Sequence, residues 1–348
     1  YSPGRFFLFL RGGQSPPLPP LFLMPSPRPR KPAHHDNLAL VEQLLTDATR
    51  TPGHLGHAAS YLLERPGKRV RARLCLDLSA SLQIPPEHGI ALAAAVELLH
   101  NASLVLDDVQ DNDEMRRGRA SIWRTFGRNQ AINLGTFLIA QSTSLAARLP
   151  EISALFAATL REATTGQSAE FDFHTTTPTL PAYEKMAEAK TGALFALAAE
   201  SAATLARLPA ELAGTIGDSF ARLGAAYQIQ DDLADAFGLK GRSRPGLDLR
   251  EGKANSLVLF HLALCPGDQA AFLAFLRDTS SRTDHQQLDA WLQQLFASGA
   301  IAATQQHLHR LCHEITDSCA ELPAPFAPHL ATLAAGVREP AIFQRTGD

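Results

Sequence analysis

The stretch Leu104–Arg117 reads Leu-Val-Leu-Asp-Asp-Val-Gln-Asp-Asn-Asp-Glu-Met-Arg-Arg and follows a run rich in Ala, Val and Leu. Its first three aspartates are Asp107, Asp108 and Asp111. Residues three and four apart share one face of a helix, so Asp111 lies on the same face as each of the other two. Like charges at this spacing repel, and a positive group is expected nearby. Arg116 and Arg117 can supply part of this positive charge. The alternative interpretation is that the aspartates lie at a solvated helix end and have no shared function.

A second copy of this spacing lies about 120 residues on. Tyr227–Asp235 reads Tyr-Gln-Ile-Gln-Asp-Asp-Leu-Ala-Asp, again after an apolar helical run. Its aspartates are Asp231, Asp232 and Asp235. Six carboxylates facing each other would suit hard cations, and Mg²⁺ in particular completes its coordination with water and substrate phosphates. The sequence therefore indicates a phosphate ester or diphosphate substrate.

Composition and charge narrow the class of protein. The 348 residues are 45% hydrophobic and 19% charged, which is typical of a globular chain. A net charge of -3 gives no footprint of a nucleic-acid partner. We expect no membrane span, because no run approaches the roughly 20 apolar residues that a span needs. The four cysteines show no Cys-x-x-Cys pair, which favours reduced thiols and a cytoplasmic location.

The chain divides into an N-terminal extension and one domain. Residues 1–35 hold short apolar patches broken by Gly, Ser and Pro, so we expect them to be disordered or non-native, with Met24 a plausible native start. From residue 36 to 348 we expect a single all-α domain, a bundle of long helices around a central cavity. Apolar residues recur at helical spacing, and no stretch alternates like a strand. The expected helices span residues 38–45, 54–63, 70–82, 86–111, 131–149, 152–171, 180–208, 212–237, 255–264, 270–276, 286–296 and 301–319.

Basic and amide residues accompany the aspartates. Lys68, Arg69 and Arg71 stand at the start of a helix, where free N–H groups favour an anion, so a bound phosphate explains them better than helix stability does. His100 lies on nearly the same helix face as Asp107 and could donate to a second anion. The polar residues Lys190 and Thr191 interrupt one apolar helix, and Gln167, Glu170 and Asp172 interrupt another. Such groups need partners, either a shared polar cavity or salt bridges from Lys190 to Glu188 or Asp172.

A histidine-rich stretch near the end of the chain also resembles a metal set. It contains His307, His309, Cys312 and His313. No acidic helper or distant ligand pair is evident, so an exposed amphipathic helix is favoured over a zinc site.

Taken together, the motifs resemble the trans-isoprenyl diphosphate synthases, the polyprenyl synthetase family. The resemblance runs from about Gly67 to Lys253 and includes both aspartate motifs in order with the basic elements between them. The segments that carry it are Gly67-Lys68-Arg69-x-Arg71, Glu97-Leu98-Leu99-His100, Asp107-Asp108-x-x-Asp111, Arg116-Arg117-Gly118, Gly166-Gln167, Lys190-Thr191-Gly192, Gln228-Ile229-Gln230-Asp231-Asp232-x-x-Asp235 and Gly252-Lys253. The resemblance implies an all-α fold, usually a homodimer.

The resemblance also implies roles for these residues. The two motifs, Asp107, Asp108, Asp111, Asp231, Asp232 and Asp235, would hold three Mg²⁺ ions, or Mn²⁺, on an allylic diphosphate. That diphosphate would also contact Arg116, Lys190 and Lys253. Isopentenyl diphosphate would sit on Lys68, Arg71, His100 and Arg117. Thr191, Gln228 and Gln167 would stabilise a carbocation formed when the allylic carbon–oxygen bond ionises.

Some positions depart from the family pattern. Where the family commonly has a Gly-Lys after the second motif, the nearest candidates are Lys240, Arg242 and Arg244, with Ser243 at the Lys position. Asn255 stands where a Thr is usual, and Thr136 where an Asp is frequent. We still expect an active enzyme.

Product length and rival classes remain open at this stage. Small residues, Ala102 and Ser103, stand one turn before Asp107, so we expect a deep cavity and a product of C20 or longer, with geranylgeranyl diphosphate favoured over farnesyl or C25 to C50 diphosphates. Phe137 or another bulky residue could set the floor instead. One rival is a non-catalytic regulatory subunit of a heteromeric synthase. The other is a class I terpene cyclase, and the complete second motif with Lys68 and Arg71 argues against the cyclase.

Overall fold

The computed structural model describes residues 34–173, 176–238 and 245–338 of the chain. The described residues belong to one compact unit. Residues 1–33 of the predicted N-terminal extension lie outside the described residues. The basic candidates Lys240, Arg242 and Arg244, and Ser243 with them, also lie outside the described residues.

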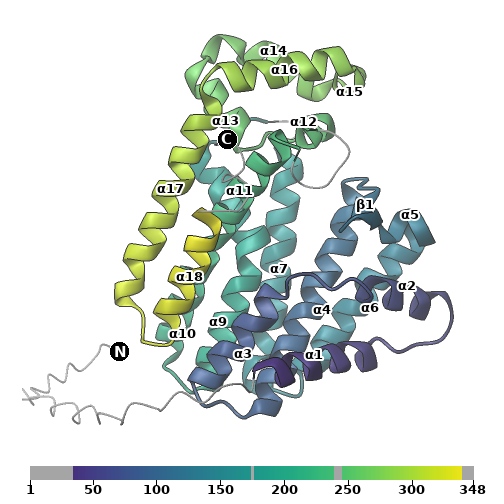
Figure 1. Ribbon diagram of the computed structural model, residues 1–348, viewed down its shortest axis with the longest axis vertical. Helices are drawn as coiled ribbons and strands as arrows, with labels where there is room; N and C mark the ends of the chain where they lie inside the picture. Colours follow the sequence, from purple (N-terminus) through teal and green to yellow (C-terminus); the bar gives the residue numbers. More distant parts are fainter. Residues whose placement is uncertain (1–33, 174–175, 239–244, 339–348) are drawn as a thin grey trace, which may run out of the picture. The chain divides into compact units, whose positions relative to one another are not determined.

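The predicted all-α fold is confirmed, and long helices dominate it (Figure 1). The first half of the unit contains α1 (His34–Ala48), α2 (Gly53–Leu63), α3 (Val70–Ser81), α4 (Pro86–Gln110), α5 (Ile122–Phe126), α6 (Arg128–Ala146) and α7 (Pro150–Asp172). The second half contains α8 (Leu180–Ala187), α9 (Ala193–Leu205), α10 (Ala210–Ala221), α11 (Leu223–Ala236), α12 (Leu247–Glu251), α13 (Ser256–Leu264), α14 (Gln269–Arg277), α15 (Thr279–Thr283), α16 (His285–Ala297), α17 (Ala300–Ser318) and α18 (Phe326–Arg338). Short 3₁₀ helices, η2 (Pro266–Asp268) and η3 (Cys319–Glu321), lie between them.

The expectation of no strand was wrong at one short hairpin. β1 (Met115–Arg116) pairs antiparallel with β2 (Arg119–Ala120) directly after the first aspartate motif. The two linking residues, Arg117 and Gly118, have φ of 54° and 76°, the positive values that a tight two-residue hairpin turn needs. Strands of two residues are too short to show an alternating pattern, which is why the sequence did not reveal them.

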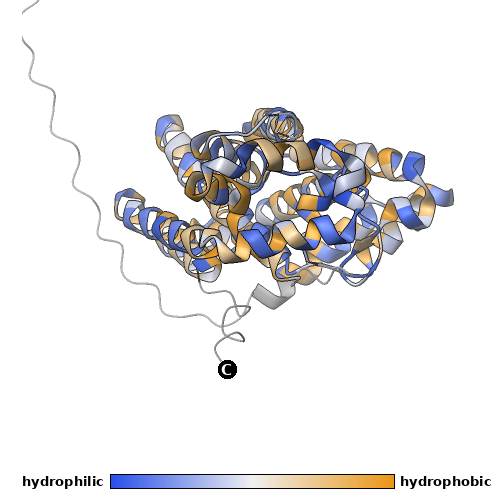
Figure 2. Cartoon of the chain, turned by 90° about the horizontal axis from the view of Figure 1, so that it is seen from above, coloured by the Kyte–Doolittle hydropathy of each residue, from blue (hydrophilic) through white to orange (hydrophobic). Residues whose placement is uncertain are grey.

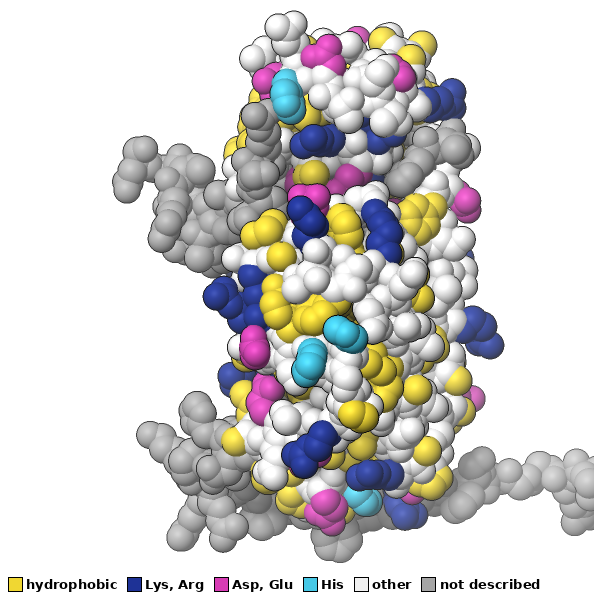
Figure 3. Space-filling view, turned by 90° about the vertical axis from the view of Figure 1, so that its right-hand side faces the viewer, with side chains coloured by type: hydrophobic (Ala, Val, Ile, Leu, Met, Phe, Trp, Pro, Cys, Tyr) yellow, Lys and Arg dark blue, Asp and Glu magenta, His cyan; other side chains and the backbone are white. Residues whose placement is uncertain are grey.

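The helices pack around α4, which contacts α6, α3, α1 and α9. Most residues of α4 between Gly89 and Val105 are buried, many of them alanines that allow neighbouring helices to approach closely. Figure 2 shows that individual helices carry both hydrophobic and hydrophilic residues, as expected for amphipathic helices around a core. On the face drawn in Figure 3, basic and acidic side chains are interspersed.

A second, smaller apolar core lies within α12–α16. It contains Leu249, Val258, Phe272, Leu288 and Leu295, with Trp291 packed against it. The helix α13 joins the two cores, because Leu257 and Leu259 belong to the large core while Val258 and Leu262 belong to the small one. Figure 1 shows α14, α15 and α16 together beyond the end of α13.

Helices long and apolar enough to cross a membrane were not expected from the sequence, yet α4 meets both criteria. Two-thirds of its most apolar window, 67%, is buried inside the unit, which is typical of the core helix of a globular fold. Among the described residues, α13 with Pro266–Arg277 passes the same test only as a pair bent by 111°.

Candidate active site

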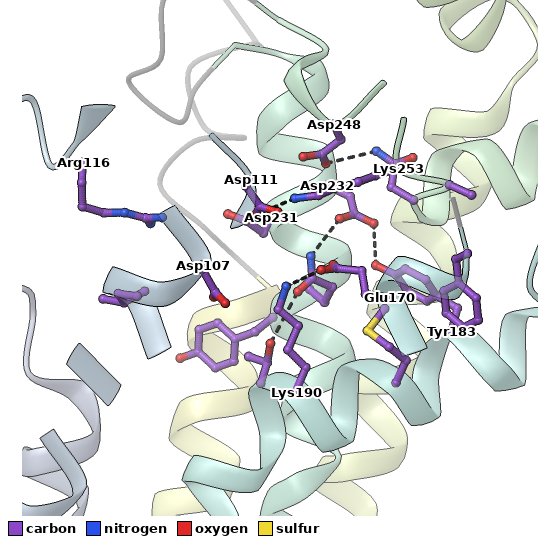
Figure 4. A pocket seen from close by; sticks show the side chains of 18 residues that line it. Asp107, Asp111, Arg116, Glu170, Tyr183, Lys190, Asp231, Asp232, Asp248 and Lys253 are labelled. Carbon is purple, nitrogen blue, oxygen red and sulfur yellow. Dashed lines mark hydrogen bonds and ion pairs between the residues drawn. The ribbon is translucent and has the colours of Figure 1, made fainter. Parts of the chain in front are cut away.

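Four of the six motif aspartates line one cavity of about 270 Å³, here called the acidic cavity (Figure 4). Asp107 and Asp111 reach it from the C-terminal end of α4, and Asp231 and Asp232 reach it from α11. Cationic groups stand among these carboxylates, namely Lys190, Lys253 and Arg116. Two helices that are distant in sequence thus bring four of the six aspartates to one cavity.

The other two motif aspartates do not line this cavity. Asp108 is 2% exposed and forms an ion pair with Arg116, whose guanidinium also lies 3.4 Å from Asp113. Asp235 is 3% exposed, and its Oδ2 accepts a hydrogen bond from the backbone N–H of Asp248 at 3.0 Å. Sequence spacing alone could not separate these roles, because Asp108 and Asp232 hold the same position in their motifs, yet only Asp232 lines the cavity.

Asp232 is held by several donors at once. Its Oδ2 accepts from Tyr183 Oη at 2.5 Å, from Ser256 Oγ at 2.7 Å and from the Ser256 N–H at 2.8 Å. Its Oδ1 accepts from Gln228 Nε2 at 3.2 Å. Burial, with the charge of Asp232 adding to it, raises the pKa of Tyr183 well above its usual value, so the phenol remains a donor. These contacts fix the carboxylate at the wall of the cavity.

Each lysine of the cavity is paired with carboxylates. Lys253 Nζ lies 2.8 Å from Asp111 Oδ2 and 2.9 Å from Glu251 Oε2. Lys190 Nζ lies 2.6 Å from Glu170 Oε2, whereas the sequence had suggested Glu188 or Asp172 as its partner. Burial works against the charged form of both amines, but the surrounding carboxylates outweigh it and raise both pKa values. Both side chains are therefore ammonium ions at neutral pH.

A π-helical turn, η1 (Glu188–Gly192), between α8 and α9 presents Lys190 and Thr191 to the cavity. A wide turn of this kind often marks a functional site. The C-terminal end of α10 approaches it so closely that a Cβ on Gly192 would stand 2.0 Å from the carbonyl oxygen of Ala221. Thr191 Oγ1 lies 3.5 Å from Gln228 Oε1, so two of the predicted site residues meet there.

A second cavity of about 270 Å³, here called the apolar cavity, adjoins the first. It shares four lining residues with the acidic cavity, namely Leu104, Asp107, Lys190 and Thr191. The rest of its wall is mainly aliphatic or small and includes Leu99, Ala102, Ser103, Leu106, Ile139, Leu160, Ala163 and Leu194. Gln167 also lines it, and its Nε2 donates to Gln110 Oε1 at 3.1 Å.

A third hollow of about 830 Å³, here called the basic pocket, is lined by all four residues predicted to bind isopentenyl diphosphate: Lys68, Arg71, His100 and Arg117. Arg117 is placed there by the β1–β2 turn and donates to the carbonyl of Arg65 at 2.9 Å. Gly67 leaves room for it, because a Cβ there would lie 2.7 Å from Arg117 Nη2. Arg69 is instead neutralised by Glu42 and Glu97, at 2.7 and 2.8 Å.

Arg71 and His100 belong to both the basic pocket and the apolar cavity. Arg71 Nη1 lies 3.5 Å from His100 Nε2, and its guanidinium stands 4.3 Å from the ring centroid of Phe195. Burial, followed by the charges of Arg71 and Arg117, lowers the pKa of His100 well below its usual value, so the imidazole is neutral. The three hollows are therefore contiguous, in the order acidic, apolar and basic.

Several cavity residues were missed by sequence reasoning. Glu170 stood out as a polar residue in an apolar helix but received no role, and Tyr183, Tyr227 and Asp248 carried no signal of their own. Asn255, noted as a departure from a usual Thr, caps α13 by accepting from the Val258 N–H and donates to Asp248 Oδ2. Thr136 is exposed and bonds its own helix at Ile132.

The histidine-rich stretch of α17 shows contacts other than metal ligation. His307 is buried, contrary to the expected exposed helix, and its Nε2 lies 2.6 Å from Glu184 Oε1. His313 bonds Asp317 one turn later.

Comparison with known proteins agrees with this geometry. The family model described as polyprenyl synthetase matches residues 52–295. A short chain isoprenyl diphosphate synthase of Methanocaldococcus jannaschii is 32% identical over 223 residues, which cover 62% of this chain and 68% of the relative. A geranylgeranyl pyrophosphate synthase of Aspergillus flavus is 30% identical over 260 residues, covering 73% and 74% respectively.

A solved polyprenyl synthase from Caulobacter crescentus, complexed with calcium and isoprenyl diphosphate, has the same fold. Its TM-score is 0.78 at 26% identity, with 88% of this chain and 96% of that chain covered. Three other curated relatives are much longer, and this chain spans only 35 or 36% of their length.

Proposed function

The chain belongs to the polyprenyl synthetase family, and from that membership we propose that it condenses isopentenyl diphosphate with an allylic diphosphate to form a trans-polyprenyl diphosphate. The family and its structural relatives indicate a prenyltransferase enzyme. One observation carries the specific reaction. An acidic cavity and a basic pocket, each suited to a diphosphate, open onto one apolar cavity between them.

The acidic cavity suits the allylic diphosphate with divalent cations. Its donor set consists of the carboxylates of Asp107, Asp111, Asp231 and Asp232, and Mg²⁺ prefers such oxygen ligands. Bound there, Mg²⁺ or Mn²⁺ would neutralise the charge of the leaving diphosphate. Asp108 and Asp235 do not line the cavity, and the prediction that all six aspartates hold three ions remains part of this proposal.

The lysines would bind the same diphosphate directly. Lys190 and Lys253 are partly buried ammonium ions whose carboxylate partners lie within 3 Å. Charge-assisted bonds to phosphate oxygens are stronger than neutral ones. Arg116, which also lines the cavity, would add a guanidinium from the hairpin side.

The basic pocket suits isopentenyl diphosphate. Lys68 is exposed there, and Arg117 donates to the backbone carbonyl of Arg65 and so keeps its charge available to an anion. Arg71 is partly buried, and its buried Nε makes no hydrogen bond among the described residues. Neutral His100 can donate one ring N–H without adding charge. The pocket is therefore ready for a dianionic group.

The chemistry then occurs in the apolar cavity between these sites. The allylic carbon–oxygen bond breaks, the isopentenyl double bond attacks the carbocation to form the new carbon–carbon bond, and a proton leaves to the departing pyrophosphate. Oxygen atoms of Thr191 and Gln228 lie where they can stabilise the cation. The aliphatic wall excludes water that would otherwise capture it.

We infer that the product is geranylgeranyl diphosphate, with farnesyl and C25 to C50 products as alternatives. The small side chains predicted to open the chain path, Ala102 and Ser103, do line the apolar cavity. Larger aliphatic residues on its wall include Leu99, Leu106, Ile139, Leu160 and Leu194, whereas Phe137 does not line it. The similarity to a geranylgeranyl pyrophosphate synthase favours the same length.

The experiment below also distinguishes two alternative functions. A non-catalytic regulatory subunit would bind a partner without turning over substrate, and a terpene cyclase would act on an allylic diphosphate alone. Homodimerisation and a cytoplasmic location also remain predictions, the first to be checked by light scattering after size-exclusion chromatography.

The test is incubation of the full chain with Mg²⁺, labelled isopentenyl diphosphate and, separately, dimethylallyl, geranyl or farnesyl diphosphate. Products are sized after dephosphorylation. A discrete prenyl alcohol that disappears in Asp107→Ala and Asp231→Ala supports the proposal. Lack of incorporation with every primer contradicts catalysis and favours the regulatory subunit, whereas hydrocarbon release from an allylic diphosphate alone favours the cyclase.

A further inference from the structure

A buried histidine in the smaller core lacks a hydrogen bond on either ring nitrogen. His261, on α13, is 1% exposed. Neither Nδ1 nor Nε2 has a hydrogen-bond partner among the described residues, although Nε2 lies 3.1 Å from Asp268 Oδ2. An unpaired buried polar atom is costly, so such an atom in a native fold calls for an explanation.

Two further ligand-type side chains surround this imidazole. Cys265 follows His261 by one helical turn at the end of α13, and Asp268 closes the adjoining 3₁₀ helix η2. The three donor atoms, one from each residue, all lie within 4.8 Å of one another. The chain bends by 111° between α13 and the segment that starts at Pro266, which turns Asp268 back toward the imidazole.

We propose that His261, Cys265 and Asp268 bind a zinc ion. Imidazole nitrogen and thiolate sulfur suit Zn²⁺, whereas Mg²⁺ prefers oxygen ligands alone. Three protein ligands leave a fourth tetrahedral position for water. Ligation would use the lone pair of a ring nitrogen that now lacks a partner.

The surroundings of the cluster favour such a site. The rings of Phe272 and Trp291 lie next to the imidazole, with centroids 6.1 and 6.3 Å away, and cover it from solvent. Cys265 is a free thiol of intermediate exposure, and the Asp268 side chain is 44% exposed. The ion therefore has an entry path on one side and a buried anchor on the other.

Binding would fasten one end of a helix whose other end touches the acidic cavity. Ser256, the first residue of α13, donates two hydrogen bonds to Asp232, while the zinc ligands lie at the last turn and beyond. None of the three ligands lines the acidic cavity. The inferred role is structural, because the ion would join α13 to the bend that leads into α14. Ligation by the Cys265 sulfur would release its thiol proton to solvent.

The competing interpretation is a plain ion pair between protonated His261 and Asp268. It explains the 3.1 Å separation but leaves Nδ1 unpaired and gives Cys265 no part. The two interpretations differ in one measurable respect, which is whether the sulfur of Cys265 ligates a metal.

The test uses the reduced full chain, stripped with a chelator and titrated with Co²⁺ in excess Mg²⁺. Cobalt bound to a thiolate gives a near-ultraviolet charge-transfer band that carboxylate sites do not give. We expect one equivalent of this band in the wild type, its displacement by Zn²⁺, and its absence in Cys265→Ser. Cys319→Ser is the matched control, because Cys319 also lies at a helix end, donates to the carbonyl of Ile315 and is not one of the three proposed ligands.

Stability gives a second readout. Zinc at about 100 times its Kd should raise the Tm of the wild type and of Cys319→Ser by roughly 5 °C more than that of Cys265→Ser. Asp268→Asn, at an exposed carboxylate, should weaken cobalt binding about tenfold or more. This variant tests metal binding by the cluster if Cys265→Ser does not fold. A wild type without the sulfur band, or a band that persists in Cys265→Ser, would overturn the proposal.

Discussion

Lys253 Nζ lies 2.8 Å from Asp111 Oδ2, so a residue from the loop after α12 is tied to the first aspartate motif at the end of α4. The same ammonium also contacts Glu251 at 2.9 Å. The contact brings the two halves of the acidic cavity together. It also keeps a positive charge beside the carboxylates that would meet a diphosphate.

Replacing this lysine should affect substrate binding and turnover together. In Lys253→Met the ammonium is lost while the aliphatic length is kept. Removing a charged hydrogen-bonding group costs about 1.5–3 kcal/mol, so kcat/KM for the allylic diphosphate should fall roughly 10- to 100-fold. Steady-state kinetics measure the loss. Lys185→Met, at an exposed lysine of α8, is the control and should leave the kinetics unchanged.

The hydrogen bond from Tyr183 to Asp232 should matter for both stability and metal affinity. Tyr183→Phe removes a 2.5 Å donor to a buried carboxylate and should lower the free energy of unfolding by about 1.5–3 kcal/mol. Because the carboxylate is less firmly oriented, Mg²⁺ affinity should also fall several-fold or more.

Tyr61→Phe is the matched control for that variant. It also removes one phenol donor, here to the carbonyl of Ala120 at 2.8 Å, outside the acidic cavity. Urea unfolding and Mg²⁺ titration of both variants compare the two effects. Equal loss of Mg²⁺ affinity in both would show that Tyr183 acts only through general stability.

The ionisation of Glu251 should make stability depend on pH. Burial, opposed by Lys253, raises the pKa of this carboxyl to about 7 in the folded state, from an ordinary value of 4.5. Between these values the folded state binds more protons than the unfolded state, so the free energy of unfolding falls as pH rises through this window. The contribution present below pH 4.5 is lost by about pH 8 and amounts to roughly 3 kcal/mol.

Glu251→Gln cannot ionise and should lack this fall. In metal-free buffer, the variant should gain on the wild type as pH rises from 5 to about 8. Urea unfolding at several pH values gives the difference, and Glu87→Gln, at an exposed residue of α4, serves as the control. A constant difference across the range would mean that Glu251 titrates normally.

Product length should respond to the wall of the apolar cavity. Ala102 is 1% exposed and lines this cavity one turn and a residue before Asp107. In Ala102→Phe the added ring occupies the cavity, so the main product should become shorter by at least one C5 unit. Leu160→Ala, which enlarges the same cavity, should shift products toward longer chains. Chromatography of dephosphorylated products gives both answers, and unchanged chain length in both variants would place the limit elsewhere.

Much of the fold could be predicted because its signals are local. Apolar residues at helical spacing indicated most long helices, and proline or glycine marked many breaks. The strong periodicity of α4 and α11 placed both aspartate motifs on helices before their contact was known. The short helices α5, α12 and α15 were missed because five residues show little periodicity, and α18 was not expected although it is long enough.

The site was harder to predict because orientation depends on tertiary packing. The spacing of Asp107 and Asp108 cannot tell which carboxylate meets the cavity and which pairs with Arg116. The same limit hid Tyr183, whose role depends on the approach of α8 to α11. The hairpin that presents Arg116 and Arg117 rests on two positive φ angles, for which an Arg-Gly pair is a weak signal.

The most direct test of the account is whether the two diphosphates bind at different places. Lys68 lines only the basic pocket, and Lys190 lines the acidic and apolar cavities. The measurement is the KM for each substrate in Lys68→Met and Lys190→Met, with the other substrate saturating. The account predicts that Lys68→Met raises the KM for isopentenyl diphosphate about tenfold and leaves that for the allylic diphosphate unchanged, while Lys190→Met does the reverse. An equal rise of both constants in both variants would contradict it.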